Sequence, residues 1–82
     1  MIMYEGCKIW EIAKIIQNDW KNPYFGAVPY IEALSTMTNI QDDYGLDSGS
    51  SIVAYFLANA NTWRGDTARE VKKELKRRLN VK

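Results

Sequence analysis

The chain has 82 residues, of which 46% are hydrophobic and 26% are charged, and its net charge is +1. This length allows one domain with one hydrophobic core, and the ordinary share of charged residues argues against disorder. The sequence contains no histidine and a single cysteine, Cys7, so histidine-based catalytic sites, Cys/His zinc sites and intrachain disulfides are excluded. We therefore expect a single domain, residues 1–82, without a cofactor or metal ion.

Two helices are predicted in the first half of the chain. Between about Lys8 and Trp20, apolar residues recur at steps of three and four, the spacing of one helical face. Pro23 stops this helix, because a residue that precedes proline disfavours helical geometry. A second helix is expected to begin near Pro29, which suits a first turn, and to end near Asn39.

A loop and a third helix are expected next. The segment from Ile40 to Gly49 is polar and predicts a loop, in which three aspartates solvate the backbone or cap the following helix. The third helix is expected from about Ser50 to Trp63. Its seven consecutive apolar residues, from 52 to 58, predict a helix that is buried all round and lies at the centre. We expect Gly65 to end it in the left-handed conformation.

The fourth helix is predicted to begin after Gly65, where Thr67 and Glu70 fit a capping box. A narrow apolar stripe runs along it, formed by Ala68, Val71, Leu75 and Leu79. On a helical wheel the stripe is followed by a basic arc, formed by Arg69, Lys72, Lys73, Lys76 and Arg77, with the glutamates at the far edge. The four helices predict an all-α fold, a compact bundle around the buried third helix.

Charge is unevenly distributed along the sequence. Residues 64–82 contain eight Lys/Arg and three Asp/Glu, a net charge of +5, whereas residues 1–63 contain three and seven, a net charge of −4. A row of cations on one helix face attracts nucleic-acid phosphates. We favour the interpretation that the arc is a solvated face, on which Glu70 and Glu74 pair with basic residues three or four positions further along.

Two aromatic segments are further candidates. Trp63 and Arg64 are the residue types that dominate protein-interface hot spots, although we favour a Trp63 that closes the core. Tyr24 and Phe25 lie in the loop after the first helix, where aromatic rings can stack on nucleic-acid bases. We favour the interpretation that they fold back as a lid on the core.

Short motifs in the segment from Trp20 to Leu79 carry a family resemblance. They are Asp19-Trp20, Tyr24-Phe25-Gly26-Ala27, Pro29-Tyr30-Ile31-Glu32-Ala33, Asp43-Tyr44-Gly45, Tyr55-Phe56-Leu57-Ala58-Asn59-Ala60, Thr62-Trp63-Arg64-Gly65 and Ala68-Arg69. With these motifs, about three quarters of the chain resembles a group of small proteins encoded by tailed phages, prophages and related mobile elements. The resemblance implies a protein that acts in the cytoplasm of a bacterial host, and it implies no particular activity.

We expect a non-enzymatic interaction protein that binds a host or phage protein and inhibits or redirects it. The residues expected at that interface are Trp63, Arg64, Arg69 and Lys72. The alternative is a DNA- or RNA-binding accessory protein that uses Arg69, Lys72, Lys73, Lys76 and Arg77. Self-association into a homo-oligomer is a third reading, because ten aromatic residues are many for one small core. No apolar run approaches the length of a membrane span, so a membrane is not an expected partner.

Overall fold

The computed structural model describes residues 4–44 and 47–80. The helices in these residues are α1 (Ile9–Asp19), α2 (Val28–Leu34), α3 (Gly49–Ala58) and α4 (Asp66–Asn80), and a short 3-10 helix, η1 (Phe25–Ala27), leads into α2. Two strands of two residues each, β1 (Asp43–Tyr44) and β2 (Asp47–Ser48), pair antiparallel within the predicted loop. The predicted all-α bundle is confirmed.

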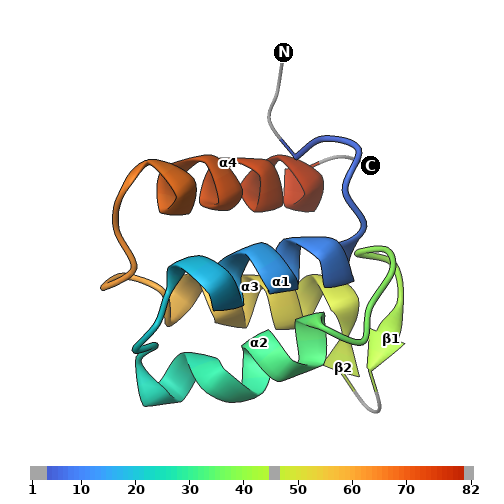
Figure 1. The fold of residues 1–82 in the computed structure, drawn as a ribbon. Helices are drawn as coiled ribbons and strands as arrows, with labels where there is room; N and C mark the ends of the chain where they lie inside the picture. The colour runs from blue at the N-terminus through green and yellow to red at the C-terminus, as the bar shows by residue number, and fades with distance from the viewer. Residues whose placement is uncertain (1–3, 45–46, 81–82) are drawn as a thin grey trace.

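Helices α1 and α3 lie between α2 and α4, and each contacts both of them (Figure 1). The core consists of the side chains at which these inner faces meet, including Ile12, Ile16, Leu34, Val53, Phe56, Val71 and Leu75. Helix α3 occupies the expected central position but is not buried all round, because Ala54, Tyr55 and Ala58 are exposed. Helix α3 packs mainly against α2 and α4, so one of its faces stays open to solvent.

Helix α2 ends five residues earlier than the sequence predicts. Pro29 lies in its first turn as expected, but the helix stops at Leu34 rather than near Asn39. The carbonyl oxygens of Thr38 and Met37 accept the backbone N–H groups of Ile9 and Trp10, at 3.0 and 2.8 Å. These N–H groups begin α1 and have no partner inside that helix. The segment after α2 therefore leaves helical geometry to satisfy the start of α1.

Helix α3 begins with a side-chain cap and a close backbone contact. The hydroxyl of Ser48 accepts the N–H of Ser51 at 3.1 Å, so this serine, and not one of the aspartates, supplies the N-cap. The N–H of Gly49 donates to the carbonyl of Asp42 at 2.6 Å. The helix ends at Ala58, so Gly65 does not terminate it. Gly65 has a φ of +113° and lies in the turn before α4.

Candidate functional site

The rotation of α4 decides which of its charges face solvent. Ala68, Val71 and Leu75 are buried, which confirms the predicted apolar stripe. Glu74 is also fully buried, whereas the sequence placed it at an exposed acidic edge. That prediction was wrong because two arginines one turn further along the same helix, Arg77 and Arg78, compensate the negative charge of Glu74 inside the protein.

Glu74 forms an ion-pair network with two arginines. Arg77 donates from Nε and Nη2 to the two carboxylate oxygens, at 2.9 and 2.8 Å, and Arg78 donates from Nε to Oε2. The hydrogen bond from Arg77, assisted by Arg78, holds the pKa of Glu74 below its usual range despite burial. A buried carboxylate is tolerated when it is paired and hydrogen-bonded in this way. Arg77 was a predicted phosphate ligand, but its guanidinium group is engaged in an ion pair with Glu74.

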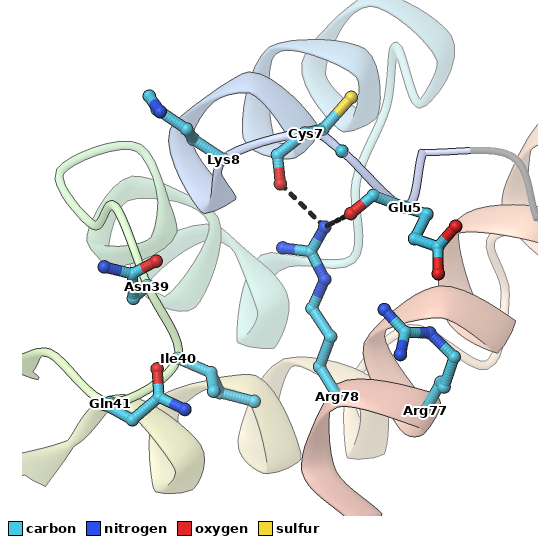
Figure 2. A pocket seen from close by; sticks show the side chains of 9 residues that line it. Glu5, Cys7, Lys8, Asn39, Ile40, Gln41, Arg77 and Arg78 are labelled. Atoms are coloured by element: carbon cyan, nitrogen blue, oxygen red, sulfur yellow. Dashed lines mark hydrogen bonds between the residues drawn. The ribbon is translucent and has the colours of Figure 1, made fainter. Parts of the chain in front are cut away.

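Arg78 also holds the N-terminal segment against α4 (Figure 2). Its Nη2 donates to the carbonyl oxygens of Tyr4, Glu5 and Cys7, at 3.0, 3.1 and 2.6 Å. The guanidinium borders a hollow of about 310 Å³ between the N-terminal segment, residues 39–41 and the end of α4. Two of the three nitrogens of Arg78 are already bonded, so this arginine is a structural clasp rather than an anion ligand.

Five cations remain on the outer side of α4 and of the turn before it. We call them the basic face: Arg64, Arg69, Lys72, Lys73 and Lys76. Arg64, Arg69, Lys73 and Lys76 are exposed, and Lys72 is half-buried. Asp66 pairs with Arg69 at 2.5 Å, but both side chains are mostly exposed and the pair is screened by water. Among the described side chains, no carboxylate forms an ion pair with the other four.

Lys72 links the basic face to the loop that precedes α4. Its ammonium group donates to the carbonyl oxygen of Trp63 at 2.6 Å and lies 5.9 Å from the centre of the Trp63 ring. Burial, together with the positive charges of Lys76 and Arg64, lowers the pKa of Lys72. Lys76 and Arg64 therefore both act on Lys72. They form one region of positive potential.

Trp63 closes the core, as the favoured interpretation predicts. Its side chain is 2% exposed and stacks on Trp20, with the ring centres 5.8 Å apart. The indole N–H donates to Asp19 Oδ2 at 2.7 Å. A shallow depression of about 320 Å³ lies outside it, lined by Trp63, Arg64, Gly65, Ala68, Arg69 and Lys72. All four residues expected at a protein interface line this basic depression, but the Trp63 indole itself points inward.

The loop aromatics do not form the expected lid. Phe25 is 79% exposed and Tyr24 is 45% exposed, and their ring centres lie 4.8 Å apart. The lid prediction was wrong because Trp20 and Ala27, at the two ends of this loop, already fill the inner positions. Beside Tyr24 is a second depression of about 280 Å³, the polar depression, lined by Tyr24, Ala58, Asn59, Asn61 and Thr62.

Among the acidic residues of the loop before α3, Asp42 has a described side chain, and its role is structural. Asp42 Oδ2 accepts the backbone N–H groups of Thr38 and Asn39, at 2.8 and 3.0 Å. These two bonds lower the pKa of Asp42. In the part of the chain that the structure describes, no three Cys, Asp or Glu side chains gather into a group that could hold a metal ion. Within the same residues, no helix combines the length and apolarity needed to cross a membrane.

Comparison of the chain with family models, with curated proteins and with solved structures gave no match. The resemblance to proteins of phages and mobile elements therefore stays a prediction.

Proposed function

We propose that this protein is a non-enzymatic binding protein that contacts nucleic-acid phosphates through the basic face. The observation that carries the proposal is the orientation of α4. Glu74 is turned inward and takes Arg77 and Arg78 with it, while Lys73 and Lys76 are left on the outside. The helix thereby separates its charges into an ion-paired inner network and an outer row in which Arg69 alone has a carboxylate partner among the described side chains. Such a row attracts phosphates by releasing their counterions.

The grouping of cations around Lys72 supports the same function. Arg64, Lys72 and Lys76 lie close enough together for two of them to lower the pKa of the third. An anion placed among these cations would be attracted by all three. Extended anions with regularly spaced charges fit a row along a helix better than a single carboxylate does. Nucleic acid is the macromolecule with that property.

The setting of the proposal comes from the resemblance described above. A small phage or mobile-element protein would act in the cytoplasm of its bacterial host, where nucleic acid is abundant. No step of the proposal needs a cofactor, a metal ion or a catalytic group. The protein would act as an accessory factor that covers or marks a nucleic acid.

A salt titration tests the proposal. Fluorescence anisotropy with labelled random-sequence DNA, single-stranded and duplex, should show binding that weakens steeply between low and near-physiological salt. Contacts with about four phosphates give a slope of log K against log salt near −4 for a duplex. The double change Lys73→Glu and Lys76→Glu should lower the affinity at least tenfold and flatten the slope by about two. Both side chains are exposed, so the fold should tolerate the change.

A matched control uses Lys8→Glu and Lys14→Glu, which alter the net charge by the same amount. Lys8 and Lys14 are exposed and belong to the start and the middle of α1. This variant should retain most of the affinity. Equal losses in the two variants would show that bulk charge, and not the basic face, determines binding. Absence of binding at low salt would overturn the proposed function.

A protein partner with an acidic surface is the second candidate. The observation that favours it is the basic depression, where Arg64, Arg69 and Lys72 surround a hollow large enough for a side chain of a partner. In this case Arg64→Ala and Arg69→Ala should each lose a captured host or phage protein. Nuclease treatment of the lysate should leave the captured protein in place, whereas a complex bridged by nucleic acid should disappear.

A further inference from the structure

We propose that the nucleic acid is single-stranded and that its bases stack on Phe25 and Tyr24. This inference rests on the proposed function and names the form of the ligand. It is carried by the exposure of the two rings and by the depression beside Tyr24, whose lining continues along the chain into that of the basic depression.

The two depressions are lined by consecutive residues of the chain. Thr62 lines the polar depression and Trp63 lines the basic depression, and consecutive Cα atoms are about 3.8 Å apart. In the proposed complex a nucleic-acid strand follows the basic face from Lys76 past Lys72 and Arg64 and crosses the loop between α3 and α4. Beyond this loop the nucleic-acid strand enters the polar depression, which Tyr24 also lines.

The Tyr24 ring is held in place. The Tyr24 ring packs so closely over Gly26 that a Cβ atom there would lie 2.6 Å from it, and the same Cβ would lie 2.9 Å from Asn59 Oδ1. Asn59 is itself anchored, because its Nδ2 donates to the Tyr55 carbonyl at 2.8 Å. Phe25 leans on Tyr24 and leaves most of its ring uncovered. A fixed ring with an open face loses little entropy when a base stacks on it.

The chemistry of this surface fits single strands. Proteins that bind single strands combine a positive track for the backbone with aromatic rings for successive bases. A duplex keeps its bases stacked inside and offers phosphates alone to the basic face. The amides of Asn59 and Asn61 and the hydroxyl of Thr62 line the space between ring and cations, and they can hydrogen-bond to base edges.

The test compares labelled oligonucleotides, a 20-nucleotide single strand and its duplex, by anisotropy at fixed low salt. Wild-type protein should bind the single strand at least about fivefold tighter than the duplex, since stacking of one base contributes that much. Phe25→Ala and Phe25→Leu should both remove this preference and leave duplex affinity unchanged. Phe25→Trp should retain it, because an aromatic face is what a base requires.

The outcomes separate the two proposals. If both nucleic acids bind equally, Phe25→Ala changes nothing and Lys73→Glu with Lys76→Glu abolishes binding, then the stacking site is wrong and the proposed function stands. If neither nucleic acid binds, the proposed function fails and the stacking site with it. If Phe25→Leu keeps the preference, an apolar contact replaces stacking and this inference is overturned. A dimer in light scattering that Phe25→Ala converts to a monomer would assign the rings to self-association instead.

Discussion

The indoles of Trp20 and Trp63 stack nearly parallel, with an angle of 11° between their planes. Trp20 follows α1 and Trp63 precedes α4, so this pair joins two turns that are 43 residues apart in the sequence. Phe56 of α3 packs edge-on against both rings. The cluster fixes the loop that carries Arg64, and thereby positions the start of the basic face.

The bond between Trp63 and Asp19 should be measurable in a double-mutant cycle. Asp19→Ala removes the acceptor of the indole N–H and should lower the free energy of unfolding by about 2 kcal/mol. In a Trp63→Phe background, which has no such N–H, the same change should cost less than about 0.5 kcal/mol. Urea denaturation of the four proteins gives the coupling. Equal costs in both backgrounds would show that the bond contributes nothing.

Glu74→Gln should destabilise the protein strongly. The change leaves Arg78, whose side chain is 13% exposed, without its anionic partner. Breaking a buried ion pair typically costs about 3 kcal/mol, which should lower the Tm of a chain of this size by more than about 10 °C. Glu70→Gln is the control on the same helix, since Glu70 is half-buried and forms none of the hydrogen bonds found for Glu74. A small effect at Glu74 would contradict the ion-pair network described above.

Stability should fall in acid, and Glu74 should account for a large part of the fall. Its pKa in the folded protein lies below the ordinary value for glutamate, about 4.3. A group with a depressed folded pKa stabilises the protein above its unfolded pKa, and this contribution is lost as pH falls through the folded value. The Tm should therefore decrease from about pH 5 downward. Glu74→Gln should show a shallower decrease, and the two curves should converge in strong acid.

Gly49→Ala should destabilise the start of α3. An added Cβ would lie within 3.0 Å of the carbonyl oxygens of Ile40 and Asp42, and these backbone atoms cannot move aside as a flexible side chain would. Overpacking of this kind costs about 1 to 3 kcal/mol. Gly6→Ala provides the contrast, because nothing lies within 4 Å of its added Cβ. If the two variants had the same Tm, the backbone of residues 40–42 would be able to move away from the added Cβ more easily than its contacts indicate.

Local patterns predicted the helices and the buried side of α4, because an apolar helix face is buried on folding regardless of which element packs against it. The end of α2 could not be predicted, since it depends on α1 requiring the carbonyls of Met37 and Thr38. The burial of Glu74 likewise depends on how α4 is rotated against its neighbours. One signal was available: on the helical wheel Glu74 lies next to Val71, which is buried.

The exposure of Phe25 was also beyond local reasoning. The loop around it contains three aromatic residues within six positions, and sequence alone cannot tell which of them fills the limited space inside. The structure gives that space to Trp20, which can stack on Trp63, and leaves Phe25 outside. Competition among similar side chains for one interior is settled by packing across the whole molecule.

The clasp at Arg78 has a consequence for protein synthesis. The carbonyl groups it holds belong to residues 4, 5 and 7, which leave the ribosome 71 to 74 residues before Arg78 does. The carbonyl groups of residues 4, 5 and 7 therefore acquire this partner only after Arg78, in the last turns of α4, has been synthesised. A chain that ends before Arg78 would leave these three carbonyl groups without their guanidinium partner.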